Sequence, residues 1–104
     1  LLDIAHEAIL VKDLDDRIIY WNKGAERTYG WTAAEALGRK SCELFRPDPA
    51  RFEAALAVLM ETGEWRGELQ KRTKAGRVLI IEVGWTLVRD AAGRSLVDRV
   101  VIHW

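Results

Sequence analysis

Apolar residues follow two different periodic patterns along the chain. Residues 8–13 and 17–21 are apolar and β-branched runs on either side of residues 14–16, a pattern that predicts a β-hairpin. Strand-like segments with a period of two follow Gly63 and cover residues 65–73, 77–88 and 96–104. We therefore expect a hairpin near the start of the chain and an antiparallel meander after Gly63.

Helix start and stop signals occupy the region between these strands. Asn22 is expected to cap a helix over residues 23–29, which Gly30 ends in a left-handed conformation. Thr32-Ala-Ala-Glu35 is a capping-box pattern, because the Thr hydroxyl and the Glu carboxylate can each bind the other residue's amide. It predicts a very short helix that ends at Gly38.

The longest predicted helix begins at Asp48-Pro49 and ends at Gly63. A capping carboxylate before a proline at the first helical position favours helix initiation. Apolar residues recur in it at spacings of three and four, which predicts one buried face. Two strands, then short helices, then three strands predict an α+β fold, a five-stranded antiparallel sheet with short helices packed on one face.

The second meander strand, residues 77–88, predicts which face of the sheet is buried. One parity contains only apolar residues and is expected to face the helices: Leu79, Ile81, Val83, Trp85 and Leu87. The other parity is half polar, so we expect it to be covered in part by an N-terminal helix or a partner chain. Asp98 and Arg99 interrupt the last strand, which indicates either a bulge or an edge position.

Length and charge exclude several classes of protein. A chain of 104 residues is the size of one domain, and 16 basic residues balance 16 acidic ones. Without a net positive field, nucleic-acid binding is not expected. The densest basic stretch, Lys71, Arg72, Lys74 and Arg77, surrounds Ala75-Gly76 and is interpreted as a solvated hairpin tip.

Cysteine usage and hydropathy indicate where the protein works. The lone Cys42 can form no intrachain disulfide, which favours a reducing compartment, and we expect the cytoplasm. No apolar run approaches the roughly 20 residues that span a bilayer, so no direct membrane contact is expected, although a parent protein could be anchored. The chain starts at Leu1 without Met and stops at Trp104 within a strand-like stretch, so we expect an excerpt of a larger multidomain protein.

No catalytic constellation is visible in the sequence. There is no Cys and His pair at metal-ligand spacing, no Gly-rich phosphate loop and no nucleophile elbow. His6 and His103 lie near opposite ends of the chain, and His103 is expected to be a surface or interface residue. The carboxylates are expected at caps, turns and solvent-facing positions. A small enzyme is therefore only a remote alternative.

Five segments in sequence resemble the successive patterns of a known family. They are residues 13–22, 25–31, 36–39, 62–68 and 88–94. In this order and spacing they are similar to PAS domains, also called sensory boxes, over nearly the whole chain. Ala75-Gly76 departs from the Asp-Gly that usually forms the hairpin after the long helix, without disturbing the expected fold.

The resemblance implies that residues 1–104 form a single PAS domain of a bacterial signalling protein, and we expect that protein to be a sensor histidine kinase. Such a domain detects a small ligand in a cavity between helices and sheet and relays it to an adjacent output domain. The alternative is a ligand-free PAS module that only dimerises or binds proteins. Both alternatives include a homodimer, in which Trp104 is a candidate interface residue.

Candidate lining residues of that cavity follow from parity and helical spacing. They are Phe52, Leu56, Leu59, Met60, Leu69, Ile81, Val83 and Trp85. They would suit a small apolar or aromatic ligand. The Trp85 indole either fills the cavity or stacks on a ring of the ligand, and filling is favoured. Volume separates a ligand site from a packed core, because useful sites measure roughly 300–1,000 Å³.

Two cofactors of the superfamily are disfavoured by the residues. Flavin-binding light sensors carry a reactive Cys in an Asn-Cys-Arg-Phe-Leu-Gln run, whereas Cys42 stands one place late in residues 38–45. That offset turns the thiol by about 100° on a helix, so Cys42 is predicted to be a small buried apolar residue. Haem sensors place a His on the long helix, where residues 48–62 contain none, and Met60 is interpreted as core.

Overall fold

The chain folds into a curved antiparallel sheet with helices on one face, which confirms the predicted α+β architecture. The structure, a computed structural model, describes residues 7–90 and 93–103. The expectations for His6 and Trp104 lie outside the described residues, as does that for the side chain of His103. In chain order the elements are β1 (Ile9–Asp13), β2 (Ile18–Trp21), α1 (Lys23–Tyr29), α2 (Ala33–Ala36), α3 (Ser41–Phe45), α4 (Pro49–Thr62), β3 (Glu64–Arg72), β4 (Val78–Asp90) and β5 (Gly93–His103).

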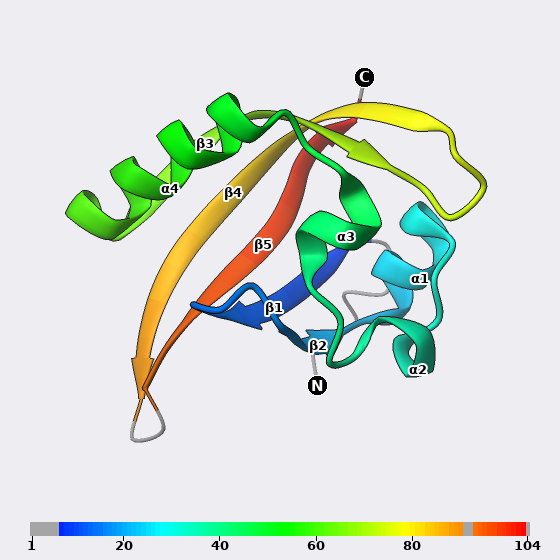
Figure 1. Cartoon of the computed structure of the whole chain (residues 1–104), viewed down its shortest axis with the longest axis horizontal. Helices are drawn as coiled ribbons and strands as arrows, with labels where there is room; N and C mark the ends of the chain where they lie inside the picture. Colours follow the sequence, from blue (N-terminus) through cyan, green and yellow to red (C-terminus); the bar gives the residue numbers. More distant parts are fainter. Residues whose placement is uncertain (1–6, 91–92, 104) are drawn as a thin grey trace.

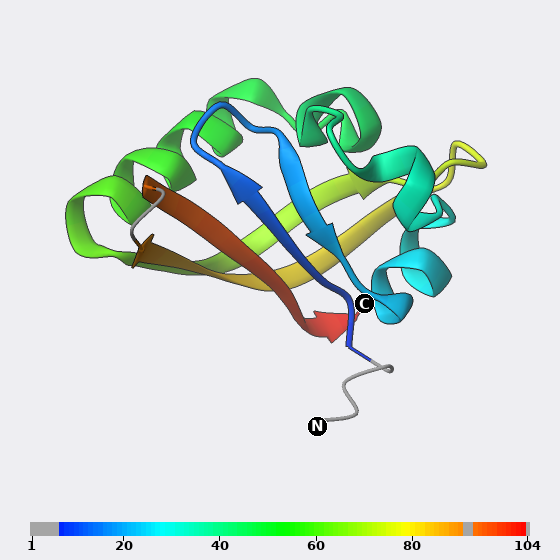
Figure 2. The same ribbon diagram turned by 90° about the horizontal axis from the view of Figure 1, so that it is seen from below.

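The strands are ordered β2-β1-β5-β4-β3, and each neighbouring pair is antiparallel. Helices α1–α4 all lie on one side of this sheet (Figures 1 and 2). Because β5 is the central strand, an edge position for Asp98 and Arg99 is wrong. A register irregularity does occur in the β4–β5 pairing, but it lies between Glu82 and Val83 on β4.

The turn between β1 and β2 forms without glycine because Asp16 adopts a left-handed backbone, with φ of 69°. A short polar side chain tolerates this conformation better than a branched one. Asn22 then begins α1: its side-chain oxygen accepts from the Ala25 amide at 2.7 Å and from the Ile9 amide at 2.9 Å. Asn22 therefore caps a helix and fixes β1 against it.

The predicted caps of the other helices are also present. Thr32 and Glu35 form the capping box of α2, and Asp48 accepts from the Arg51 amide at the start of α4. Gly63 ends α4 with φ of 86°, in the left-handed region that glycine adopts without strain. These local signals set the ends of α4, which lies over β3 and β4 (Figure 1). Ala55 and Leu59 on its apolar face are buried.

The parity predicted for β4 is confirmed. Ile81, Val83 and Trp85 are buried beneath the helices, and Leu79 and Leu87 are half-buried beside them. The opposite parity carries exposed apolar side chains: Val78, Ile80 and Val88. The sheet thus has one packed face and one face that is partly apolar and exposed.

Candidate functional site

The predicted pocket residues meet between α4 and the inner face of the sheet, with one exception. The residues that pack together are Phe52, Leu56, Leu59, Leu69, Ile81, Val83 and Trp85. Met60 is 38% exposed, so its assignment to the pocket is wrong. It follows Leu59 on α4, and one residue turns a side chain by about 100° around the helix, which directs it away from the sheet.

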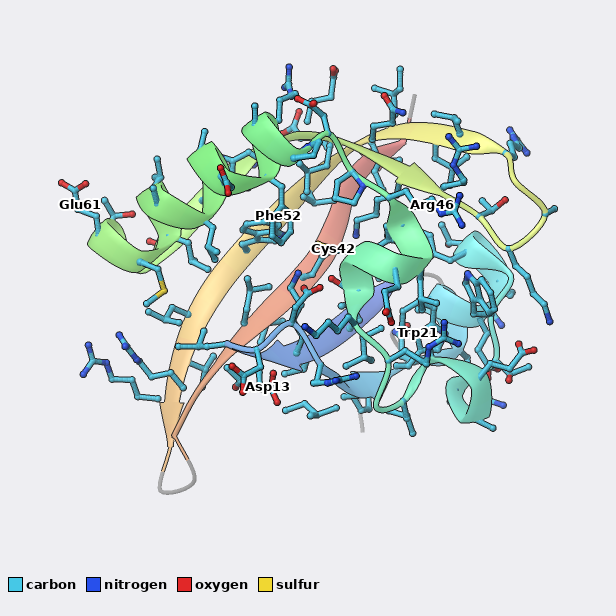
Figure 3. All side chains as sticks on the ribbon, viewed as in Figure 1. Asp13, Trp21, Cys42, Arg46, Phe52 and Glu61 are labelled. Atoms are coloured by element: carbon cyan, nitrogen blue, oxygen red, sulfur yellow. The ribbon has the colours of Figure 1, made fainter. Side chains whose placement is uncertain are left out.

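Trp85 occupies the middle of the space in which the sequence predicts a ligand. Its side chain is 2% exposed, and its ring centroid lies 5.4 Å from that of Phe52 in an edge-on arrangement. The Trp65 ring packs against it at 5.0 Å. Figure 3 shows Phe52 pointing from α4 toward the sheet. Two aromatic rings therefore pack against Trp85, and both roles predicted for its indole, filling the cavity and stacking on a ligand ring, stay predictions.

Lys71 and Asp98 form an ion pair inside the protein. Lys71 Nζ donates to the two carboxylate oxygens of Asp98 at 2.9 and 2.8 Å, and the side chains are 2% and 3% exposed. The Trp85 indole N–H donates to Asp98 at 3.0 Å. Lys71 also donates to the Tyr29 hydroxyl at 3.0 Å. One polar network thus joins β3, β4 and β5 to α1.

This pair corrects two predictions. Lys71 is not part of a solvated hairpin tip, because β3 continues to Arg72 and Lys71 shares the inward parity of Leu69. Asp98 is not a solvent-facing carboxylate, because it pairs with Leu10 and Trp85 across the central strand and points to the same face as they do. Both side chains are instead fixed inside by their mutual charge.

Burial controls protonation in this network. It lowers the pKa of Lys71, and the negative charge of Asp98 opposes that shift. Burial and the charge of Asp98 both raise the pKa of Tyr29 well above its ordinary value of 10.0. Tyr29 is therefore a neutral phenol at neutral pH, and Lys71 depends on Asp98 to remain charged.

A second ion pair lies close to the first. Lys12 on β1 is 3% exposed, and its Nζ donates to Asp16 Oδ1 and to Ser41 Oγ, each at 2.8 Å. Ser41 Oγ and the Cys42 amide donate in turn to Asp16, at 2.6 and 2.8 Å. Burial would raise the pKa of Asp16, but Lys12 and these hydrogen bonds outweigh it and hold the pKa below its usual range. The pair connects β1 to α3.

The two networks line one small cavity. Its volume is only about 10 Å³, and its walls are Lys12, Ser41, Phe45, Pro47, Phe52, Leu69, Lys71, Trp85 and Asp98. A space of that size holds about one water molecule, far below the roughly 300 Å³ of a small-molecule site. The interior is therefore closed around the charged groups in this conformation.

A larger hollow lies outside the same wall. It measures about 420 Å³ and is lined by Cys42, Arg46, Pro47, Pro49, Phe52 and Glu53, at the junction of α3 and α4. Pro47 and Phe52 border both this hollow and the interior cavity. Figure 3 shows Cys42, Arg46 and Phe52 around this junction. The two side chains thus separate a surface depression from the buried lysines.

A hollow of about 680 Å³ lies over Gly84 and has a charged rim. Four charged side chains at or beside it are paired, Arg66 with Glu82 and Arg99 with Glu7. Gly84 faces away from the helices, opposite the buried networks. Of the predicted pocket residues only Trp85 is among its walls, so this hollow does not coincide with the predicted pocket.

Cys42 differs from the sequence expectation, since it is only partly buried. Burial and the neighbouring Asp16 carboxylate raise the pKa of the Cys42 thiol to about 11. The residue lines the outer hollow and not the interior cavity, so the residues present do not fit a flavin whose chemistry uses this thiol. Met60 is exposed on α4, a position that does not suit an interior haem ligand.

Residues 7–90 and 93–103 contain no group of three or more His, Cys, Asp and Glu side chains that could hold a metal ion. Within the same ranges, no helix is long and apolar enough to cross a bilayer.

The buried charges of Lys12 and Asp98 were not among the predicted site residues, although strand parity carried a signal for each. Lys12 is two residues from buried Leu10, and Asp98 is two residues from buried Leu96. In a strand, residues two apart point to the same face. A charged residue at an inward parity was therefore the sign that could have identified these positions.

Comparison with known proteins gives the family. The model of the family described as the PAS fold matches residues 1–99. A PAS domain of a protein from Colwellia psychrerythraea is 28% identical, with a TM-score of 0.74, and the match covers 92% of this chain and 86% of that one. None of the curated proteins compared with the chain matches it.

Other similar structures come from different signalling proteins. An RNA-binding Light-Oxygen-Voltage receptor is 26% identical with a TM-score of 0.79, and the match covers 96% of this chain but 30% of the receptor. The PAS domain of nitrogen regulation protein NR(II) from Vibrio parahaemolyticus has the same fold, with a TM-score of 0.79, 19% identity and coverage of 96% and 91%. With residues 1–99 matched by the family model, this chain belongs to the PAS domain family.

Proposed function

We propose that this domain senses a small molecule between its helices and sheet and relays binding to an output domain of the same protein, such as a histidine kinase. PAS domains are typically non-catalytic sensory modules. A similar structure, 16% identical with a TM-score of 0.81, is a PAS domain from a two-component sensor histidine kinase. The lone Cys42 favours a reducing compartment, and the proposed location is the cytoplasm.

The observation that carries the proposal is the charged cluster where the predicted lining residues meet. Lys12, Lys71 and Asp98 are buried there among aromatic rings. A buried ion pair is often no more stabilising than apolar side chains of similar volume. Stability alone therefore gives little reason for two such pairs, whereas recognition of a polar ligand group does.

The same cluster offers a route for the signal. Its members lie on β1, β3, β4 and β5 and on α1 and α3, so a ligand that changes one hydrogen bond acts on several elements. Such a ligand shifts the domain between two packing arrangements if it binds one of them better. Asp98 is central because it lies on the middle strand of the sheet.

Mass spectrometry of a solvent extract of the purified domain, with its ultraviolet-visible spectrum, tests this function. A stoichiometric small molecule in the extract is the expected result and would name the class of signal. An empty extract and no visible absorbance would instead favour the second function.

That second function is dimerisation without a ligand. It is favoured by the interior cavity of only about 10 Å³ and by exposed apolar residues on the outer face of the sheet, among them Tyr20 and Val88. Tyr20, Val11 and Val97 lie opposite one another on neighbouring strands, so they share that face. A similar structure, 20% identical, is the light-state dimer of the fungal photoreceptor Vivid. In this alternative a second copy of the chain covers the apolar face.

A further inference from the structure

The ammonium group of Lys12 has a hydrogen-bond donor that no oxygen accepts in the described part of the chain. An ammonium carries three N–H donors. Lys12 uses two of them on Asp16 and Ser41. Its remaining contacts are the faces of Phe52, 4.6 Å from Nζ to the ring centroid, and Trp85, at 5.3 Å. A positive charge inside the domain is thus directed at aromatic rings of the cavity wall.

The carboxylates of the cavity, in contrast, are already well supplied with donors. Asp16 accepts from Lys12, from the Ser41 hydroxyl and from the Cys42 amide. Asp98 accepts twice from Lys71 and once from the Trp85 indole. A cationic ligand would have to displace a lysine from its partner. The group left without a partner is therefore the third N–H of Lys12, which needs a hydrogen-bond acceptor. Beside an ammonium group, a negatively charged acceptor binds most strongly.

Phe52 is the barrier between this ammonium and solvent. It lines the interior cavity and also the outer hollow of about 420 Å³. Its side chain is only half-buried, so rotation into the hollow moves it over a short path. The vacated place lies against the Trp85 ring, which requires an apolar or aromatic occupant. The Phe52 ring therefore occupies a place that the ring of a ligand can take.

We infer that the site takes a small organic anion, a carboxylate joined to an apolar or aromatic group. The carboxylate accepts from Lys12, and the apolar group replaces Phe52 against Trp85 while Phe52 occupies the outer hollow. This inference rests on the proposed sensory function, because it names the ligand class of the same site.

Isothermal titration calorimetry with matched pairs of probes tests the inference. Benzoate and hexanoate are compared with benzyl alcohol and hexan-1-ol, which keep the apolar group and lose the charge. A charge-assisted hydrogen bond is stronger than one between neutral groups, so each carboxylate is expected to bind at least about 10-fold tighter than its alcohol. The tryptophan fluorescence, measured in a parallel titration, is expected to change because the ligand replaces the Phe52 ring beside Trp85.

Variants separate the role of Lys12 from general packing. The double variant Lys12→Met/Asp16→Asn removes both charges together, so no buried charge is left unpaired. It is expected to lower benzoate affinity at least about 10-fold and to leave benzyl alcohol affinity within about 2-fold. Lys23→Met, whose side chain is 78% exposed, is the matched control and is expected to change neither. Near-ultraviolet circular dichroism checks that each variant is folded.

The Phe52→Ala variant tests whether a ligand reaches the interior cavity past Phe52. It keeps the inference falsifiable even if the wild-type cavity opens rarely. Removal of the Phe52 ring is expected to speed the association of benzoate with the domain and to raise its affinity. The inference is overturned if benzoate binds neither the wild type nor Phe52→Ala, or if carboxylates and alcohols bind equally. A neutral molecule in the solvent extract would also overturn it, yet would support the sensory function, so the two can fail separately.

Discussion

Replacement of Lys71 alone is expected to destabilise the fold strongly. Lys71→Met leaves the Asp98 carboxylate buried without its ammonium partner, and breaking a buried ion pair in this way costs about 3–5 kcal/mol. In Lys71→Met/Asp98→Asn both charges are removed, and the Asn oxygen can still accept from the Trp85 indole. We expect the double variant to recover most of the lost free energy of unfolding, measured by urea denaturation.

The exposed Lys40 provides the control for this experiment. It has no side-chain hydrogen bond at the start of α3, so Lys40→Met is expected to change the free energy of unfolding by less than about 0.5 kcal/mol. Equal destabilisation by the single and double variants would show that lost packing, and not the unpaired carboxylate, dominates.

Asp16 makes the stability of the domain depend on pH in the acid range. Its pKa in the folded state is below the ordinary value, so its contribution is fully present above about pH 4 and is lost as the pH falls through the lowered pKa. Asp16→Asn is therefore expected to be less stable than the wild type at pH 7, by about 1.5–3 kcal/mol. The difference should begin to shrink near pH 4 and should disappear once the pH is below the lowered pKa.

Thermal unfolding followed by circular dichroism between pH 2 and 8 measures this difference. Asparagine also tolerates a positive φ, so the backbone at position 16 remains possible in the variant. Asp15→Asn, at the exposed neighbouring position, is the control and should follow the wild-type curve. A wild-type advantage that does not shrink in acid would contradict the assignment to the Lys12–Asp16 pair.

At the level of single residues, the strand and parity of a residue were predicted more accurately than the burial of its side chain. The parity of Ile81, Val83 and Trp85 placed them correctly, because apolar type and inward parity agree at these sites. At Lys71 and Asp98 residue type and parity disagree, and residue type gave the wrong environment. Charge pairing between distant strands decides such positions, and a local pattern contains no information about the partner.

Among the secondary-structure elements, those with capping signals were predicted most accurately. The bounds of α1 and α4 follow from Asn22, Gly30, Asp48 and Gly63, because each signal acts within a few residues of the helix end. These interactions are local, so they are fully encoded in the neighbouring sequence. The elements that carry them could be placed without knowledge of the tertiary structure.

Helix α3 and the place of β5 could not be predicted in the same way. Lys40 starts α3 without a side-chain cap, and Arg46 ends it with a left-handed φ of 49°, which is unusual for a residue with a side chain. The central position of β5 depends on pairing with β1, which is far away in the sequence, as well as with the neighbouring β4. Both features come from tertiary contacts, and they position Ser41 and Asp98 in the site.

For the whole molecule, the exposed apolar face of the sheet predicts self-association. Val88 is 38% exposed on the face that points away from the helices. If a second copy covers this face, Val88→Glu places an unpaired charge in the interface and is expected to weaken the dimer at least about 10-fold. Sedimentation velocity over a range of protein concentrations measures the effect.

Val58→Glu is the matched control, since Val58 is 43% exposed on α4. It introduces the same charge on the helical side of the molecule and is expected to leave the dimer unchanged. A wild-type domain that remains monomeric at the highest concentrations, or equal weakening by both variants, would remove this face as the dimer interface.

The shared wall between the interior cavity and the outer hollow also has a practical consequence. Cys42 is the only cysteine of the chain, it is partly exposed, and it lines the hollow next to Phe52. A thiol-reactive fluorophore attached to Cys42 would lie beside the wall that separates the hollow from the interior cavity. No other cysteine would have to be removed first. Because the pKa of this thiol is about 11, labelling requires alkaline buffer or long reaction times. The domain is thus suited to conversion into an optical biosensor with a single point of attachment.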